Sequence, residues 1–333
     1  MILAGDIGGT NTRLAFFDEK GELLKSVIEK IYPSRKHASL EEIVSTFLSE
    51  QKVSINHACF GIAGPVKDGR CETTNLPWLV DSRILAKALD IETVRLINDL
   101  EANAYGVAVL DPDDFKIINK GGPNAKGNAA IIAAGTGLGE AGFYWDGKDL
   151  HPFACEGGHT DFAPRNELEI ELLRFLSDRF EHVSYEHVLS GPGLYNIYQF
   201  LRDTGRGEEP AWLTEEVRRK DPAAVISALA IEEKSELCIQ ALDLFVSLYG
   251  SEAGNLALKT MATGGVYIGG GIAPKIVKRR ADGLFMQSFT AKGRMRSLLE
   301  AIPVCVILND KTALLGAARY AKSLAAEPSA FAV

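Results

Sequence analysis

A glycine-rich turn near the start of the chain has residue types that suit phosphate binding. It reads Gly5-Asp6-Ile7-Gly8-Gly9-Thr10-Asn11. Glycines let the backbone approach an anion closely and adopt positive φ, so that consecutive N–H groups can point at one phosphate. Asp6 cannot favourably face a bare phosphate, so we expect it to hold hydrated Mg²⁺ there. The alternative is a structural hairpin turn, in which adjacent glycines are common.

A second glycine-rich turn, Gly135-Thr136-Gly137-Leu138-Gly139, matches the first. It is expected to close over the β- and γ-phosphates of a nucleotide from the other side. Residues 137–142 also fit the dinucleotide pattern G-x-G-x-x-G, but that pattern must open a helix, and here it runs into the strand-like Phe-Tyr-Trp. A P-loop spacing that starts at Gly142 fails because Asp149 replaces the required Ser or Thr. Both of these motifs are rejected.

The two turns lie within a longer internal echo between residues 4–23 and 133–150. Superposing Gly9 on Gly137 also places Phe16-Phe17-Asp18 on Tyr144-Trp145-Asp146. In both places a strand enters the turn, an amphipathic strand leaves it, and a turn containing Asp follows. This repetition predicts a duplicated fold with a nucleotide between its halves.

Three further segments carry polar groups or bare backbone. Asn98-Asp99 ends an expected strand, where ligands bind in α/β sheets, and Asp99 could accept a proton from a hydroxyl; a helix N-cap is the alternative. Glu156 and His159 flank two glycines and could clamp sugar hydroxyls, or form an exposed polar loop. Glu186 alone is better explained as an acid at a helix start. A strand over 265–268 empties into Gly269-Gly270-Gly271, which suits an adenine face or a tight turn.

Strand-like and helix-like runs alternate through the chain, which predicts an α/β architecture. Strands are expected at 1–7, 12–17, 23–28, 57–62, 93–97, 128–134, 140–145, 265–268 and 304–308. Helices are expected at 40–50, 82–89, 99–109, 167–179, 197–201, 214–219, 223–230, 234–258 and 312–325.

Length and composition fit two domains of an ordinary enzyme. The chain has 333 residues, of which 46% are hydrophobic and 24% charged. A net charge of −8 argues against nucleic acid, and the basic run 275–280 fits a solvated helix face. The five cysteines form no C-x-x-C pair. Without an apolar stretch of membrane-spanning length or a signal peptide, the expectation is a cytoplasmic protein with no membrane partner.

Taken together, the motifs resemble the actin-like ATPase superfamily of sugar kinases, and more closely the bacterial glucokinase family. The similarity runs over nearly the whole chain, in this order: GDIGGTNTRLA at the start, TTNLPW at 73–78, IND at 97–99, EGGH at 156–159, YEHVLSGPGL at 185–194, GNLAL at 254–258, GGVYIGGGI at 264–272, FTAKGRM at 289–295, AIPV at 301–304 and LLGAA at 314–318.

The resemblance implies roles for matching positions. Asp99 resembles the general base that takes the proton from a sugar 6-hydroxyl. Asn98, Glu156, His159 and Glu186 resemble the residues that hold the other hydroxyls, and the loop at 5–10 resembles the nucleotide-binding loop. The related ROK kinases carry a C-x-C-G-x-x-G-C zinc motif that this sequence lacks, so a structural zinc is not expected.

The family fold implies a small domain of residues 1–110 plus 306–333 and a large domain of 111–305, with the active-site cleft between them. The expected reaction transfers the γ-phosphoryl of MgATP to the 6-hydroxyl of glucose, and a homodimer is what the family suggests. One alternative is a kinase of another hexose. A second alternative is a sugar- and nucleotide-binding regulator. Such regulators usually carry a DNA-binding helix-turn-helix in front of the sugar-binding fold, whereas the first expected strand here begins at residue 1. A third alternative is a chaperone- or actin-like ATPase.

Overall fold

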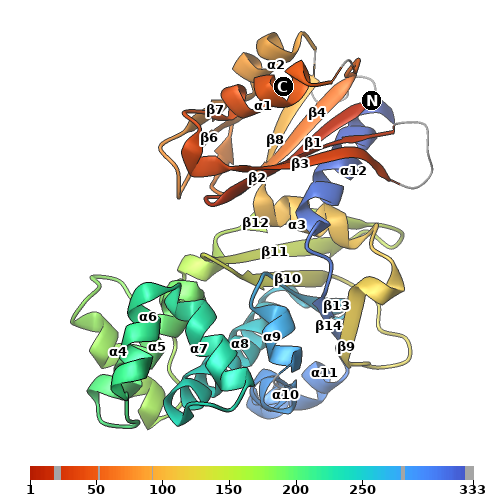
Figure 1. Ribbon diagram of the computed structural model, residues 1–333. Coiled ribbons are helices and arrows are strands. Elements are labelled where there is room, and N and C mark those ends of the chain that lie inside the picture. Colours follow the sequence, from red (N-terminus) through yellow and green to blue (C-terminus); the bar gives the residue numbers. More distant parts are fainter. Residues whose placement is uncertain (19–23, 52, 92, 279–281, 327–333) are drawn as a thin grey trace. The chain divides into compact units, whose positions relative to one another are not determined.

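The computed structural model describes residues 1–18, 24–51, 53–91, 93–278 and 282–326. The chain forms two compact units (Figure 1). Unit 1 comprises Met1–Pro112 and Asn309–Val333, and unit 2 comprises Asp113–Leu308. Strand β14 (Val304–Ile307) crosses the expected boundary between residues 305 and 306 and lies wholly in unit 2.

Unit 1 is built on a five-stranded sheet of order β3-β2-β1-β4-β8. A small second sheet has the order β5-β6-β7. The strands of unit 1 are β1 (Ile2–Ile7), β2 (Asn11–Phe17), β3 (Ser26–Pro33), β4 (His57–Ile62), β5 (Val66–Lys67), β6 (Arg70–Glu72), β7 (Leu79–Asp81) and β8 (Thr93–Asn98). Its helices are η1 (Ser34–Lys36), α1 (Leu40–Ser49), α2 (Ser82–Leu89), α3 (Asp99–Val107), η2 (Pro112–Asp114), which runs into unit 2, and α12 (Thr312–Ala326).

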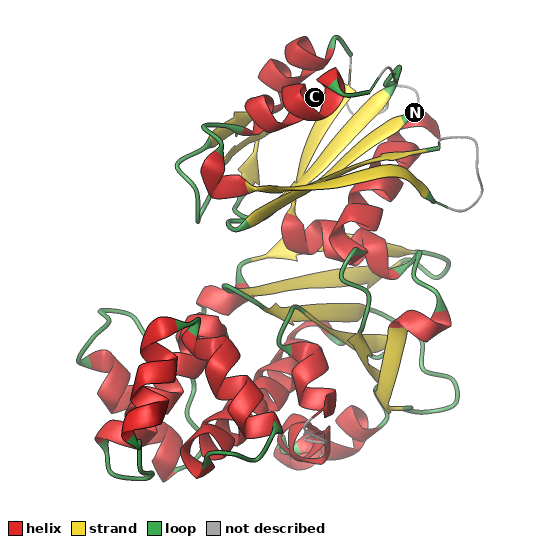
Figure 2. Cartoon of the chain, viewed as in Figure 1, coloured by secondary structure: helices red, strands yellow, loops and turns green. Residues whose placement is uncertain are grey.

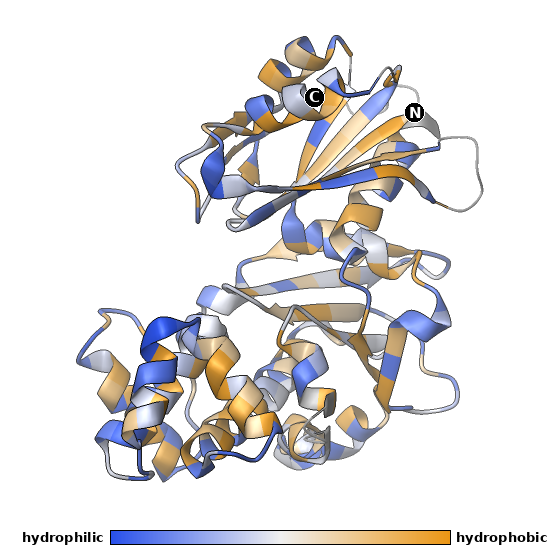
Figure 3. Cartoon of the chain, viewed as in Figure 1, coloured by the Kyte–Doolittle hydropathy of each residue, from blue (hydrophilic) through white to orange (hydrophobic). Residues whose placement is uncertain are grey.

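The main sheet of unit 1 is covered on both faces. Successive side chains of a strand point to opposite faces, and in β1 Leu3 and Ile7 join the core under α1 and α2, whereas Ile2 and Ala4 join the core under α3 and α12. Strands that are buried on both faces read as nearly continuous apolar runs. Figure 3 accordingly colours much of β1 and β4 on the hydrophobic side of the scale.

Helix α12 reaches unit 1 from the end of the chain and packs against α3 through two glycines. A Cβ on Gly106 would collide with the carbonyl oxygen of Thr312, and one on Gly316 would collide with that of Ala102. The two helix backbones therefore approach more closely than any larger residue would allow. Only a glycine at each crossing point permits this contact.

Unit 2 is built on a six-stranded sheet of order β12-β11-β10-β13-β14-β9. Its strands besides β14 are β9 (Phe115–Asn119), β10 (Ala129–Ala134), β11 (Leu138–Trp145), β12 (Leu150–Cys155) and β13 (Gly265–Gly269). Its helices are η3 (Gly157–His159), α4 (Glu167–Ser177), η4 (Tyr185–His187), α5 (Gly191–Asp203), α6 (Ala211–Arg219), α7 (Pro222–Ile231), α8 (Glu236–Thr260), α9 (Ala273–Lys278), α10 (Asp282–Thr290), η5 (Gly293–Met295) and α11 (Arg296–Glu300).

The long helix α8 is the centre of the unit 2 core. Most of its residues are buried, and the hydroxyl of Tyr249 lies 3.1 Å from the backbone nitrogen of Ala134 and 3.1 Å from the backbone oxygen of Ile132. The Tyr249 hydroxyl also lies 3.2 Å from the oxygen of Gly269. This one side chain therefore ties α8 to the ends of β10 and β13, where the second glycine-rich turn begins.

The two main sheets have the same topology over five strands, which confirms the predicted duplication (Figure 2). In unit 1, β1 is antiparallel to β2 and parallel to β4, which is parallel to β8. In unit 2, β10 is antiparallel to β11 and parallel to β13, which is parallel to β14. Unit 2 adds β9 beyond the shared set, antiparallel to β14.

The strand register corrects the ungapped superposition of the echo. In the first hairpin the Gly8 N–H donates to Asn11 O at 3.0 Å, which leaves Gly9 and Thr10 at the tip. In the second, the Gly135 N–H donates to Gly137 O at 2.9 Å, which leaves Thr136 alone. Because the second turn is one residue shorter, Gly8 corresponds to Gly135, and Gly9 does not correspond to Gly137.

Several expected elements differ at the edges of the sheets. The third strand was expected at 23–28, but β3 spans Ser26–Pro33, and residue 23 lies outside the described residues. The strands β5, β6, β7, β9 and β12 were not predicted. Within the described residues, no helix combines the length and apolar character that a membrane span requires.

Candidate active site

The first glycine-rich turn is anchored from below by Ser34. The buried Ser34 hydroxyl donates to Gly8 O at 2.8 Å and lies 2.9 Å from the hydroxyl of Thr12, while its N–H donates to Thr10 O at 2.9 Å. These contacts fix both strands of the turn. They leave the side chains of Thr10 and Asn11 exposed. The turn is therefore rigid at its base and polar at its tip.

The structure gives the glycines of this turn a packing role that was not predicted. The prediction relied on close backbone approach to an anion and on positive φ, and none of Gly5, Gly8 and Gly9 has a positive φ. Instead, a Cβ on Gly9 would lie 2.6 Å from the Cβ of Asn75, and one on Gly5 would lie 2.5 Å from the Phe60 ring. Close packing, and not left-handed backbone, excludes larger residues at these two positions.

Asp6 lies on β1 immediately before the turn, opposite Arg13 on β2. Burial raises the pKa of its carboxyl to about 6, although the Arg13 guanidinium opposes this shift. Arg13 is itself committed to Asp310, at 2.9 Å. Asp6 makes no hydrogen bond to any described residue, so its oxygens remain available to a cation. A single carboxylate fits Mg²⁺, which keeps several waters and binds substrate phosphates as well.

Asn98 and Asp99 begin helix α3. The Asn98 Oδ1 accepts the Leu100 N–H at 2.8 Å and its Nδ2 donates to Gly64 O at 3.2 Å, so Asn98 is the N-cap of α3. Asp99 Oδ1 also accepts the Leu100 N–H, at 2.9 Å. The structural alternative, a helix N-cap, thus holds for Asn98, and these bonds leave its second N–H unused.

The sheet of unit 1 brings these residues to one edge. Ile7 and Asn98 are both in register with Ile62, the last residue of the strand between them. Neighbouring strands are spaced by about 4.8 Å, so the end of β1 and the end of β8 lie about 10 Å apart. Asp6, the first turn and Asp99 therefore share the carboxyl edge of the parallel strands, as expected of an α/β ligand site.

In unit 2, the second turn is anchored by charged and backbone groups. The Leu138 N–H donates to Glu186 Oε2 at 2.9 Å, and Gly135 O accepts the N–H of Gly191 at the start of α5. A Cβ on Gly137 would lie 2.5 Å from Glu186 Oε2, so a larger residue there would displace the Glu186 carboxylate. A Cβ on Gly135 would meet nothing within 4 Å, so packing does not require glycine there.

The predicted sugar-binding residues of unit 2 gather around this turn. A Cβ on Gly158, in η3, would collide with Leu138 O, so η3 packs directly on the turn. The Tyr185 N–H, in η4, donates to Thr160 O at 3.0 Å and joins η4 to η3. Glu156 and His159 are exposed, and their side chains form no hydrogen bond within the part of the chain that the structure describes. Both are free to bind a ligand.

The triple-glycine turn lies beside the second turn. Ala133 on β10 is in register with Gly269 on β13, so both strands end at the same edge. Gly270 has φ +80°, and a Cβ there would collide with Ala134 O, so a tight structural turn accounts for this glycine. A Cβ on Gly271 would meet nothing within 4 Å. Of the three predicted glycines, Gly271 is thus the one with open space beside it.

Comparison with known proteins identifies the family. The glucokinase family model matches residues 3–324. The chain is 42% identical to the glucokinase of Nostoc punctiforme over 97% of its length and 99% of that protein's.

The chain belongs to the glucokinase family.

Solved structures agree with this glucokinase assignment. A crystal structure of a glucokinase from an Antarctic psychrotroph is similar with a TM-score of 0.80 and 32% identity, covering 97% of this chain and 98% of that one. A ROK family glucokinase from Streptomyces griseus, solved with glucose and AMPPNP, is similar in fold, with a TM-score of 0.64 and 19% identity over 97% of this chain and 99% of that one. The predicted actin-like ATPase fold of the glucokinases and related sugar kinases is thereby confirmed.

Sequence reasoning assigned no role to three residues that support this glucokinase site. Ser34 and Asn75 position the first turn, and Glu140 lies buried beneath η3. Ser34 lies in no motif, and Asn75 lies within TTNLPW at 73–78, which indicated the family but not a contact with Gly9. Glu140 carried a signal, because a lone acid inside the apolar strand 138–145 conflicts with the surrounding pattern.

Proposed function

We propose that this chain is a glucokinase that transfers the γ-phosphoryl of MgATP to the 6-hydroxyl of D-glucose and releases glucose 6-phosphate and MgADP. The family membership over nearly the whole chain carries this proposal. The glucose and AMPPNP bound to the Streptomyces relative support both substrates. The exposed and uncommitted Glu156 and His159 beside Glu186 supply the groups that a sugar needs.

In this proposal Glu156, His159, Glu186 and Asn98 bind the sugar hydroxyls that do not react. Carboxylates accept hydrogen bonds from hydroxyls, and such charge-assisted bonds contribute about 1.5–3 kcal/mol each. Glu186 shares its charge between Leu138 N–H and the sugar. Asn98 offers only its remaining N–H, because its oxygen caps α3.

Asp99 is the proposed general base. It accepts the proton of the 6-hydroxyl as that oxygen bonds to the γ-phosphorus and the bond from the γ-phosphorus to the β-γ bridging oxygen breaks. The proton leaves with Asp99, and the electron pair of the broken bond stays on ADP. Because the phosphoryl group is already electrophilic, the main contributions are positioning and charge neutralisation. Mg²⁺, held by Asp6, would neutralise charge on the phosphates when bound.

The backbone of the two glycine-rich turns is proposed to bind the phosphates. Residues 5–11 and 135–137 present N–H groups and the hydroxyls of Thr10 and Thr136, and Gly269 and Gly270 belong to the turn proposed to face the adenine. Closure on the sugar would exclude water and suppress hydrolysis of ATP. A homodimer in the cytoplasm completes the proposal, and sedimentation of the purified chain tests the dimer.

Substitution of Asp99 by Asn tests the general base. Asp99→Asn removes proton acceptance while keeping the shape of the side chain and a hydrogen-bonding group. We expect kcat to fall about 10²- to 10⁴-fold while glucose still binds, as measured by calorimetry. Near-normal kcat would refute the role of Asp99.

A coupled assay with a panel of hexoses, and with ADP or polyphosphate as donor, tests the substrates. No turnover with any hexose would favour a sugar-binding regulator.

A further inference from the structure

Glu140 is a buried carboxyl that the proposed reaction does not use. It lies on β11 and is 1% exposed. Its Oε1 has no hydrogen-bond partner among the described residues. An unpaired polar atom in the interior costs about 1–3 kcal/mol, so a native protein rarely keeps one without a reason.

The carboxyl of Glu140 lies directly beneath the turn that carries Glu156 and His159. Glu140 is in register with Cys155, the last residue of β12 and the neighbour of Glu156. A Cβ on Gly157, the first residue of η3, would collide with Glu140 Oε2. The backbone of η3 therefore packs against this carboxyl, and a movement of the carboxyl would displace the turn 156–159.

A second buried carboxyl, Glu252 on α8, interacts electrostatically with Glu140. Glu252 is 0% exposed, accepts a hydrogen bond from Asn255 Nδ2 at 2.7 Å and pairs with Lys259 at 3.3 Å. Burial raises the pKa of Glu140 to about 8, and the charge of Glu252 raises it further than Lys259 lowers it. Lys259 thus interacts with both carboxyls, but its ion pair is with Glu252.

The other titratable groups that interact with Glu140 offer no compensation. Cys155 on β12 and Tyr249 on α8 have pKa values raised mainly by burial, so both stay neutral. An ionised Glu140 would therefore have one acidic neighbour, Glu252, and no cation of its own.

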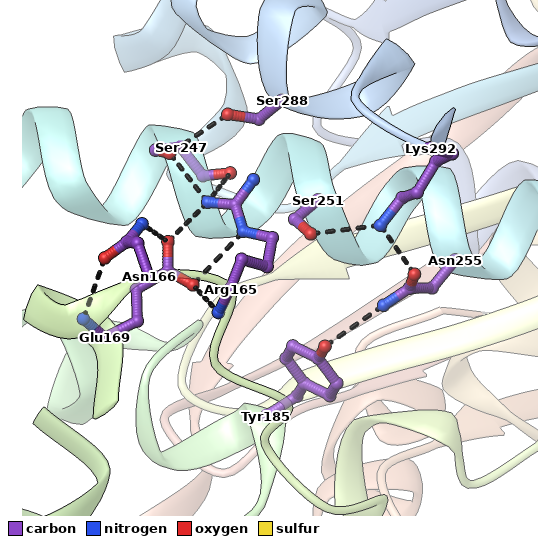
Figure 4. Close-up of polar contacts among 9 residues, drawn as sticks. All are labelled: Arg165, Asn166, Glu169, Tyr185, Ser247, Ser251, Asn255, Ser288 and Lys292. Atoms are coloured by element: carbon purple, nitrogen blue, oxygen red, sulfur yellow. Dashed lines mark hydrogen bonds and ion pairs between the residues drawn. The ribbon is translucent and has the colours of Figure 1, made fainter. Parts of the chain in front are cut away.

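Asn255, the partner of Glu252, also supports η4, the turn that carries Glu186 (Figure 4). Asn255 Nδ2 donates to the hydroxyl of Tyr185, the residue before Glu186, at 3.0 Å. Lys292 donates to Asn255 Oδ1 at 2.6 Å and to Ser251 at 3.1 Å. Glu252 therefore connects η4, through Asn255, with the Glu140 carboxyl that lies under η3.

We propose that Glu140 is a positioning residue for sugar binding, which supports the turn 156–159 as a neutral acid and weakens glucose binding when it ionises. This inference rests on the proposed function. The ionised carboxyl needs water or a donor, and η3 is the element whose backbone packs against its Oε2. Displacing η3 moves Glu156 and His159 away from their binding positions, whereas Asp99 and the first glycine-rich turn belong to unit 1.

The test measures glucose binding by calorimetry to the full chain without nucleotide, from about pH 6.5 to about pH 9. In the wild type, we expect Kd to be constant at low pH and to rise up to about tenfold per pH unit above the raised pKa of Glu140. Glu140→Gln keeps the size and stays neutral. It should bind glucose as the wild type does at low pH and lose most of the rise.

Two comparisons isolate Glu140. Burial also lowers the pKa of Lys292 to about 8, but Lys292 is present in both proteins, so its contribution is common to both profiles. Glu167→Gln removes a glutamate whose side chain is 69% exposed in the same unit and should keep the wild-type profile. In Glu140→Gln, kcat at saturating substrates should stay within about twofold of wild type, because only the sugar turn is affected.

A readout without glucose separates this inference from the kinase proposal. Infrared difference spectra at neutral pH should show a protonated carboxyl band in the wild type that Glu140→Gln lacks. An identical pH profile of Kd in wild type and Glu140→Gln, or no such band, would overturn the role of Glu140. If the wild type binds no glucose even at low pH, the proposed function fails, whatever the infrared result.

Discussion

The two glycine-rich turns occupy the same place in two sheets of the same topology, yet they are held by different chemistry. The first turn rests on neutral hydroxyls, those of Ser34 and Thr12. The second rests on the carboxylate of Glu186 and on the N–H of Gly191. Duplication has conserved the backbone path of the hairpin, while the groups that anchor it differ.

Positions that correspond in the two hairpins show the same divergence one layer deeper. Counting residue pairs from the turn, Leu14 on β2 corresponds to Glu140 on β11. Leu14 is fully buried in an apolar core, and Glu140 is a buried acid. In the proposed function, the first hairpin thus contributes to phosphate binding alone. The second links a turn proposed to bind phosphate to the residues proposed to bind sugar, because Glu186 contacts that turn and is one of those residues.

The largest expected effect tests that link. Glu186→Ala removes the acceptor of the Leu138 N–H and one proposed sugar contact, so we expect glucose affinity to fall about 10- to 100-fold and the KM for ATP to rise as well. Glu186→Gln keeps an acceptor for Leu138 N–H and should restore the KM for ATP more than the glucose affinity. Steady-state kinetics with each substrate varied would measure both. A loss confined to glucose would show that the second turn does not depend on Glu186.

An intermediate effect compares the glycines of the two turns. Gly9→Ala places a Cβ 2.6 Å from the Cβ of Asn75, and we expect it to lower the free energy of unfolding by about 1–3 kcal/mol. Gly135→Ala meets no atom within 4 Å and should change stability by less than about 0.5 kcal/mol. Its cost should appear in ATP binding instead. Denaturant unfolding and nucleotide titration separate the two, and equal destabilisation by both substitutions would contradict this difference.

The smallest expected effect concerns the neutral anchor. Ser34→Ala leaves Gly8 O and the Thr12 hydroxyl without their partner, which should cost about 1 kcal/mol in unfolding free energy. The KM for ATP should rise modestly, and glucose binding should be unchanged. Ser49→Ala is the matched control, because among the described residues its hydroxyl bonds only Thr46 O, at the exposed end of α1. A change in glucose affinity for Ser34→Ala would mean that the first turn is linked to the sugar residues too.

The elements that position the site were predictable because their signals are local. Buried central strands such as β4 and β10 are continuous apolar runs, and Asn98 carries the N-cap signal of α3. The edge strands were missed for equally local reasons. β9 has an irregular pattern with no buried residue, and β12 contains Pro152, which is tolerated only where a strand needs no second partner.

The site residues could be named, but their supports could not. Glycine in a turn predicts flexible backbone, yet Gly9 is required by Asn75, which the chain brings to it from a distant segment. The true register of the echo was likewise invisible. The ungapped superposition misplaces β11 by two residues, and a two-residue slip keeps every side chain on its face. Such a slip leaves the apolar pattern intact, so only the hydrogen-bonded register reveals it.

The close glycine contact between α3 and α12 has a consequence for the order in which the chain folds. Unit 1 needs α12, which follows unit 2 in the chain, whereas unit 2 is complete once Leu308 has left the ribosome. During synthesis unit 2 can therefore fold before unit 1, the reverse of the usual order in which the N-terminal domain folds first. Until α12 has been synthesised, Ile2, Ala4 and Cys59 lack part of the helical layer that buries them, and α3 alone can cover that face.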